Sequence, residues 1–124
     1  MTPYVYIIMG AVVGAPLRYY VQGVVQDSTA SLFPFGTLVV NVSGCLVIGL
    51  LLTLAEERGA LGPNARLALV TGFLGSYTTF STFAYESFQQ LRGHELFFAS
   101  ANIVASVFVG LAAVWIGTIL ARWV

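Results

Sequence analysis

The stretch TGFLGSYTTFSTFAYE, Thr71 to Glu86, decides the fold, because it places many hydroxyl groups inside a chain whose residues are 58% hydrophobic. Glycine weakens a helix interior, and Ser and Thr hydroxyls compete for backbone hydrogen bonds. We therefore expect an unwound backbone near Gly75–Thr79. At membrane depth, such backbone is tolerated only where it is buried in protein or lines a cavity. The alternative is a continuous helix whose hydroxyls bond back to the preceding turn.

The composition of the whole chain is that of a membrane protein. Only 8% of its 124 residues are charged, against about 25% in a soluble domain. A net charge of zero argues against a nucleic-acid partner, which requires a basic face. The N-terminal apolar stretch lacks the basic region that precedes a signal peptide's core, so we expect it to be retained as a helix.

Apolar segments long enough to cross a bilayer recur along the chain. A spanning helix needs about 20 mostly apolar residues, and the segments near 4–25, 36–55, 64–91 and 96–123 qualify. The predicted fold class is an all-α membrane protein, with one domain over residues 1–124 and four transmembrane helices, the third broken near its middle. The short polar loop LRGHE predicts that the last two helices are antiparallel neighbours.

The arginines give little preference for one orientation in the membrane. With four crossings, Arg58, Arg66 and Arg122 share the side of the termini, while Arg18 and Arg92 lie on the other. The positive-inside rule therefore gives only a weak bias, and insertion in both orientations stays open. Recurrent glycines permit close helix contacts in lipid and favour an oligomer, of which a two-fold pair is the commonest kind.

Two polar residues in the first two helices need a partner or a role, because polar groups in lipid are costly. Arg18, in GAPLRYY after Pro16, is either an interfacial anchor or part of an electropositive vestibule that attracts anions. Asn41, in FGTLVVNVSG, either bonds another helix or offers its amide donors to an anion.

The third helix carries a pair of aromatic rings and an acid. Phe80 and Phe83 are three residues apart and so share a helix face. Their electropositive ring edges either pack or replace the water of a small anion without trapping it. Glu86 would repel anions if it faced their path; it satisfies backbone or hydroxyl donors instead, or carries protons, and the sequence leaves these choices open.

Nothing in the sequence predicts enzyme chemistry or a His/Cys metal cluster. His94 is the single histidine and lies in a loop, so there is no base to activate a hydroxyl nucleophile. Cys45 is the single cysteine, which excludes an intrachain disulfide. We therefore interpret the polar residues as serving binding or transport.

Taken together, GAPLRYY, PFGTLVVNVSG and GFLGSYTTFSTFAYES resemble the fluoride channel family known as Fluc or CrcB, along the whole chain. The resemblance implies an antiparallel, dual-topology homodimer in the bacterial inner membrane. It also implies two pores at the dimer interface that let fluoride leave the cell passively, and a structural sodium ion (Na+) shared by both subunits.

The same resemblance implies roles for individual residues. The fluoride path is expected to involve one amide, two rings, three hydroxyls and one basic residue. The backbone carbonyls of two further residues are expected to hold the sodium ion. The path residues are Asn41, Phe80, Phe83, Ser81, Thr82, Ser106 and Arg18, and the sodium residues are Gly75 and Thr78.

One departure from the family concerns the fourth helix. Many members carry a tyrosine early in it, where this chain has Ala101 and Asn102. Asn102 either substitutes for the tyrosine or only packs. The alternative function is a small, dual-topology, proton-coupled exporter of organic cations. It requires a membrane-embedded carboxylate, and the predicted first helix has no acid, which leaves Glu86.

Overall fold

The computed structural model describes residues 2–124, and every regular element among them is helical. Three helices are long and apolar enough to cross a membrane: α1 (Pro3–Thr29), α2 (Phe35–Arg58) and α6 (Leu96–Trp123). Between α2 and α6, four shorter pieces follow one another: α3 (Pro63–Arg66), the π-helix η1 (Leu67–Leu74), α4 (Gly75–Tyr77) and α5 (Phe80–Arg92). The chain is therefore an all-α, multi-pass membrane protein.

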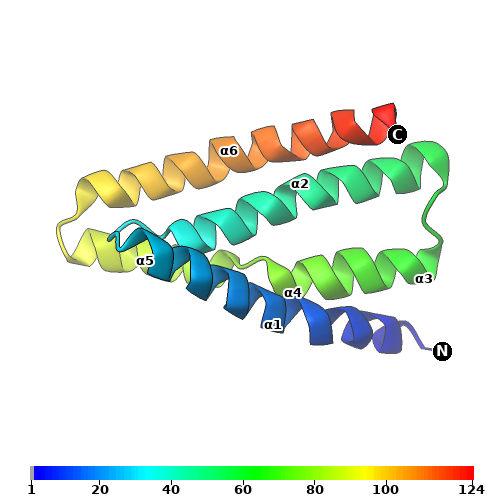
Figure 1. Cartoon of the computed structure of the whole chain (residues 1–124), viewed down its shortest axis with the longest axis horizontal. Helices are drawn as coiled ribbons and strands as arrows, with labels where there is room; N and C mark the ends of the chain where they lie inside the picture. The colour runs from blue at the N-terminus through cyan, green and yellow to red at the C-terminus, as the bar shows by residue number, and fades with distance from the viewer. Residues whose placement is uncertain (1) are drawn as a thin grey trace.

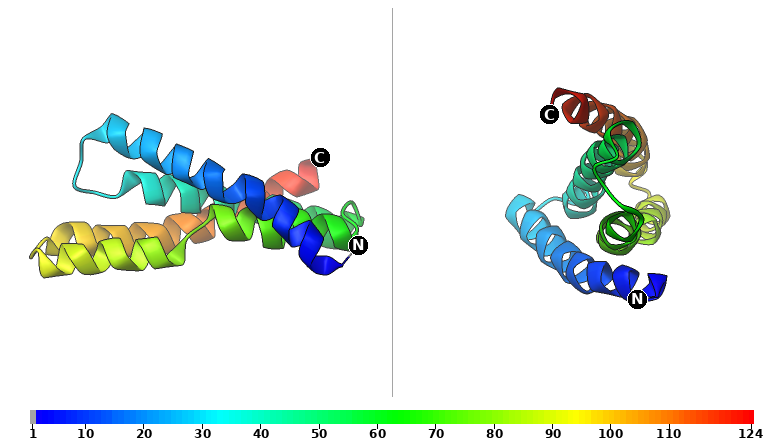
Figure 2. Two further views of the ribbon diagram at one scale, coloured as in Figure 1. Left: turned by 90° about the horizontal axis from the view of Figure 1, so that it is seen from below. Right: turned by 90° about the vertical axis from the view of Figure 1, so that its right-hand side faces the viewer.

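The helices run roughly along one long axis (Figure 1). Both termini and the connection from α2 to α3 lie at one end of the molecule, and the other two connections lie at the opposite end. Helix α2 packs along α6, while α1 packs across η1 and α4 (Figure 2). Helix α5 packs against α6 after the short loop at Gly93–Glu95, which confirms that they are antiparallel neighbours.

Prolines and a glycine in the sequence explain where several helices begin and end. Pro3 and Pro63 begin their helices, where a missing N–H costs no hydrogen bond. Gly59 ends α2 in the left-handed region at φ 61°, and its N–H donates to the carbonyl of Leu54. This conformation is readily adopted by glycine, so α2 stops there cleanly.

Helix α1 is longer than predicted, because it continues through the polar run that we expected to be a loop. The Ser28 hydroxyl donates to the Val25 carbonyl at 2.8 Å, and the Thr29 hydroxyl donates to the Gln26 carbonyl at 2.9 Å. These bonds to the preceding turn satisfy the polar side chains within the helix. As a result, the exposed Asp27 lies in the last turn of α1, and the expectation of a first helix without an acid was wrong.

Helices α2 and α6 approach closely at two glycines. A side chain on Gly49 would overlap the Val114 carbonyl, and one on Gly117 would overlap the carbonyl of Leu46. Backbone atoms cannot yield as flexible side chains do. Van der Waals packing at small residues is what holds helices together in lipid, so these two positions set the α2–α6 spacing.

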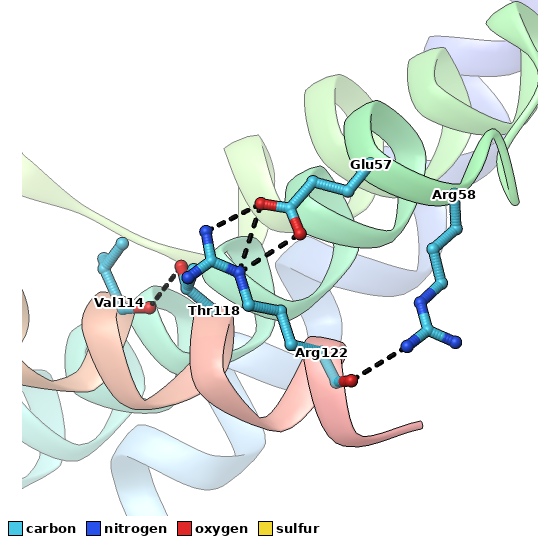
Figure 3. A network of polar contacts seen from close by, with 5 residues as sticks. All are labelled: Glu57, Arg58, Val114, Thr118 and Arg122. Atoms are coloured by element: carbon cyan, nitrogen blue, oxygen red, sulfur yellow. Dashed lines mark hydrogen bonds and ion pairs between the residues drawn. The ribbon is translucent and has the colours of Figure 1, made fainter.

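Ion pairs fasten α2 to its neighbours at the end that holds the termini. The Arg122 guanidinium donates to both carboxylate oxygens of Glu57, with the shortest contact at 2.7 Å (Figure 3). Arg58 donates to the Arg122 carbonyl at 2.8 Å. Arg66 lies 3.8 Å from Glu56. The three arginines expected on this side are therefore found together at one end of the bundle.

The interruption predicted near Gly75–Thr79 is present, but it is shorter than expected. Only Thr78 and Thr79 have extended backbone, at ψ 158° and ψ 111°. Gly75 was expected to be unwound, yet it is helical, at φ −62° and ψ −28°. The preceding π-helix continues without a gap into α4, so the helix persists for three more residues before it breaks.

Candidate functional site

The interruption is held open by one side chain from α2. Asn41 Nδ2 donates to the Thr79 carbonyl at 2.9 Å, and the Thr79 N–H donates to Asn41 Oδ1 at 2.7 Å. The amide thus pairs with both backbone polar groups of one residue, as a neighbouring strand would. Buried backbone groups must be hydrogen-bonded. Asn41 supplies these bonds to Thr79 and thereby stabilises the non-helical backbone within the membrane.

This pairing leaves other backbone groups free on both sides of the break. In a continuous helix, the Thr79 N–H would donate to the carbonyl of Gly75; here it donates to Asn41 instead. No hydrogen bond among residues 2–124 reaches the carbonyls of Gly75 or Thr78. The break therefore presents free carbonyl oxygens at the end of α4 and free N–H groups at the start of α5.

Thr79 also caps the helix that follows it. Its hydroxyl oxygen accepts from the Thr82 N–H at 3.2 Å, which is the bond expected of a helix N-cap. The same hydroxyl donates to Thr82 Oγ1 at 3.0 Å and lies 3.4 Å from the Ser81 hydroxyl. The hydroxyls of Ser81 and Thr82 are thus gathered around the first turn of α5.

One cavity of about 370 Å³ brings together most of the predicted site residues. It lies beside the break, between residues of α2, η1, α5 and α6. None of the residues that line it is charged. Six predicted residues line it, namely Asn41, Gly75, Thr78, Phe80, Phe83 and Ser106.

The two phenylalanines lie side by side at this cavity. The centroids of Phe80 and Phe83 are 5.6 Å apart, with ring planes tilted by 55°. Phe83 is half-buried, whereas Phe80 is 78% exposed. Phe83 is thus the aromatic neighbour of Phe80, and most of the Phe80 ring is left uncovered by its own chain. Its position is therefore suited to contact with a second molecule or a guest.

On the α6 side, a chain of hydrogen bonds supports Phe83. The Ser87 hydroxyl donates to the Phe83 carbonyl at 2.9 Å, and Asn102 Nδ2 donates to the Ser87 hydroxyl at 3.0 Å. The Ser106 hydroxyl donates to Asn102 Oδ1 at 3.3 Å. Asn102 has no exposed surface, so it joins α5 to α6 and does not line the cavity.

The family model described as CrcB-like protein, Camphor Resistance (CrcB), matches residues 5–118. The chain belongs to the CrcB family. A relative from Solibacter usitatus, named fluoride-specific ion channel FluC, is 46% identical over 96% of this chain and 98% of its own length. A relative of the same name from Chloroflexus aurantiacus is 48% identical over 94% of this chain and 93% of its own length. Another from Nitratidesulfovibrio vulgaris is 42% identical over 100% of both chains.

Three residues predicted for the site of this CrcB-family chain do not line the cavity. Ser81 and Thr82 belong to the capping cluster at the start of α5. Arg18 is half-buried inside α1 and lies well before the end of that helix. We expected Arg18 near a helix end; the extension of α1 to Thr29 places it further inside.

The partners of Glu86 in this CrcB-family chain were not predicted from the sequence. The Thr37 hydroxyl donates to Glu86 Oε1 at 2.7 Å, and Gln22 Nε2 donates to the Thr37 hydroxyl oxygen at 2.8 Å. The network joins α1, α2 and α5, and Thr37 is almost fully buried. Glu86 thus has a hydroxyl donor, one of the options that the sequence left open. The sequence did hold a signal for these partners, because Gln22 and Thr37 are polar residues within otherwise apolar helices.

Proposed function

We propose that this protein is a fluoride-selective ion channel through which fluoride leaves the cell passively. The observation that carries the proposal is the uncharged cavity at the helix break, lined by Asn41, Phe80, Phe83 and Ser106. Membership of the CrcB family and the shared name of its relatives support fluoride as the ion. A channel performs no bond chemistry, so the protein is not an enzyme.

The chemistry of the cavity favours a small anion that is held weakly. Fluoride needs hydrogen-bond donors to replace its water. Asn41 keeps one amide hydrogen free after bonding Thr79, and α5 begins beside it with free N–H groups and the positive end of its dipole. Ring edges of Phe80 and Phe83 add weaker positive potential. Because no lining residue is charged, fluoride would not be bound so tightly that it could not leave the cavity.

A second copy of the chain would complete the path. Gly75, Phe80 and Ser81 are exposed at the break, which lipid tolerates only where protein or a water-filled path covers the polar backbone. We infer an antiparallel, dual-topology homodimer of two four-helix subunits, with the interrupted segment 63–92 as the third crossing of each. Two pores, one at each Phe80–Phe83 pair, follow from the two-fold symmetry.

The free carbonyls at the end of α4 fit a structural sodium ion at the interface of this dimer. Alkali cations prefer oxygen ligands, and the carbonyls of Gly75 and Thr78 have no donor among the described residues. The C-terminal end of α4, which carries the negative end of the helix dipole, lies beside these carbonyls and also favours a cation. Each subunit would supply two carbonyls, so the ion would join the copies by neutralising their converging dipoles.

Removal of sodium is expected to abolish fluoride flux and to weaken the dimer. Purified protein would be dialysed thoroughly into a buffer that contains only a large organic cation. Size-exclusion chromatography and fluoride efflux would then be measured before and after sodium is restored. Sodium should restore both. Flux and dimer that persist in its complete absence would contradict the assignment of Gly75 and Thr78.

Flux from liposomes tests the function directly. Pure protein in vesicles that contain potassium fluoride, with valinomycin to carry the compensating charge, is expected to release fluoride, as measured with a fluoride electrode. Matched vesicles that contain potassium chloride should release no chloride above the protein-free background. Equal release of both ions, or of neither, would reject a fluoride-selective channel.

The second candidate function is proton-coupled export of organic cations, which requires an embedded carboxylate. Glu86 is the acid that meets this need, since Asp27 is exposed in the last turn of α1. Proton-driven uptake of a cationic dye that Glu86→Gln abolishes would favour the exporter. The cavity itself argues for the channel, because no carboxylate lines it.

A further inference from the structure

Two buried oxygen atoms of side chains on one face of α5 lack any hydrogen-bond partner among residues 2–124. They are Glu86 Oε2 and Gln90 Oε1. The two residues are four positions apart, so they share a helix face. Both line a separate cavity of about 280 Å³, at the end of the bundle where α1 connects to α2. Unpaired buried acceptors are rare and costly, so a donor is missing here.

A bound proton fits these two oxygens better than a water molecule or a metal ion does. Each of the two oxygens is sealed from solvent-sized probes by its own surroundings. A water molecule or a metal ion would have to displace side chains before it could touch either atom. A proton bound to the carboxylate needs no such space. It converts one acceptor into a donor and leaves one neighbouring acceptor to receive it.

The other hydrogen bonds show on which oxygen the proton belongs. Glu86 Oε1 already accepts from the Thr37 hydroxyl, whose own oxygen accepts from Gln22 Nε2. Gln90 Nε2 donates to the Leu32 carbonyl at 3.3 Å. With Nε2 bonded to the Leu32 oxygen, Gln90 Oε1 is the atom of this amide that stays unpaired. Glu86 Oε2 and Gln90 Oε1 are then the buried side-chain oxygens left unsatisfied among the described residues.

We propose that Glu86 is a proton-binding site: it holds a proton on Oε2 in the folded protein and donates it to Gln90 Oε1. The link would tie successive turns of α5 just beyond the helix break. It would also give a partner to both buried oxygens that lack one, Glu86 Oε2 and Gln90 Oε1.

The surroundings of Glu86 contain no positive charge that would hold it ionised. From α1 it faces Gln22 and Gln26, and Thr37 faces it from α2. On its own helix, Tyr85 is the other titratable group at the cavity. Helix α6, packed on another side of α5, has no titratable residue before Arg122. Neither Arg18 nor Asp27 of α1 lines this cavity or bonds to Glu86.

A neutral Glu86 has a consequence for ion passage that rests on the proposed function. Glu86 lies one turn beyond Phe83 on α5. An ionised carboxylate there would raise the energy of an anion near the rings. A protonated one would not, and its Thr37 bond would still join α5 to α2. The chain would thus keep a structural carboxyl group beside an anion path without its charge.

Infrared spectroscopy tests the proton directly and needs no transported ion. Purified wild-type protein at neutral pH is expected to show the carbonyl stretch of a protonated carboxylic acid. Glu86→Gln should remove this band, while the control Glu95→Gln, at an exposed position before α6, should retain it. A wild-type spectrum without the band, or a band that survives Glu86→Gln, would overturn the proposal.

A second variant keeps the test decisive if Glu86→Gln does not fold. Gln90→Leu removes the acceptor and is expected to move the acid band to higher frequency, as happens when a carboxylic acid loses its hydrogen bond. An unmoved band would exclude Gln90 as the partner. Because neither spectrum depends on fluoride, a failed flux assay with an intact acid band would reject the channel and leave the proton site standing.

Discussion

Replacement of Phe83 by isoleucine is expected to lower fluoride efflux from liposomes by about tenfold or more, which corresponds to a barrier higher by about 1.4 kcal/mol. Phe80→Ile is expected to do the same. Isoleucine keeps the position apolar and bulky, but it lacks the electropositive edge of a phenyl ring. Phe80 and Phe83 both line the uncharged cavity, so loss of either ring edge should leave a dehydrated anion unsupported at that point.

A matched substitution separates this effect from general damage. Phe88 lies on the same helix, is 55% exposed and does not line the cavity. Phe88→Ile should therefore retain nearly all of the flux. All three variants should elute from size-exclusion chromatography as the wild type does. Unchanged flux in both Phe80→Ile and Phe83→Ile would remove the rings from the mechanism.

The break itself could be predicted because its causes are local. Glycines and a dense run of hydroxyls weaken helical hydrogen bonding within a few residues, and this effect needs no tertiary contact. The spacing of Phe80 and Phe83 likewise places them on one face whatever surrounds them. These features were found near the expected positions.

The partners across the break could not be predicted, because they depend on packing between distant segments. Asn41 and Thr79 are separated by 38 positions in the chain. A mid-helix Asn has many potential partners, and only the approach of α2 to the break selects the Thr79 peptide. The same reasoning applies to Thr37 and Glu86, which are 49 positions apart.

Two errors share a different cause, namely that residues typical of loops and turns were expected to interrupt the helix. Ser28 and Thr29 indicate a turn by composition, yet their hydroxyls bond back to the preceding turn and extend α1. Gly75 indicated unwinding, but the π-helix η1 is followed directly by α4, which keeps the chain helical through Tyr77. In both places, the local sequence allows either a continued helix or an interruption, so the outcome depends on the rest of the structure.

The spacing of α2 and α6 leads to the other prediction with a large effect. Gly117→Ala is expected to destabilise the protein by about 1–3 kcal/mol, because its new methyl group would meet the backbone at Leu46 and Leu50. The midpoint of thermal unfolding in detergent should fall by roughly 4 °C for each kcal/mol. Gly49→Ala, which meets the backbone of Val114, should behave alike.

Gly110→Ala is the matched control on the same helix. A methyl group there meets only the Cys45 sulfur, at 3.5 Å, which is an ordinary contact. Its unfolding midpoint should therefore stay near that of the wild type, and equal midpoints for Gly110→Ala and Gly117→Ala would contradict the packing argument. Helix α2 carries Asn41 and α6 carries Ser106, so forcing the helices apart should also widen the cavity. Gly117→Ala is thus expected to reduce fluoride flux, although Gly117 does not line the cavity.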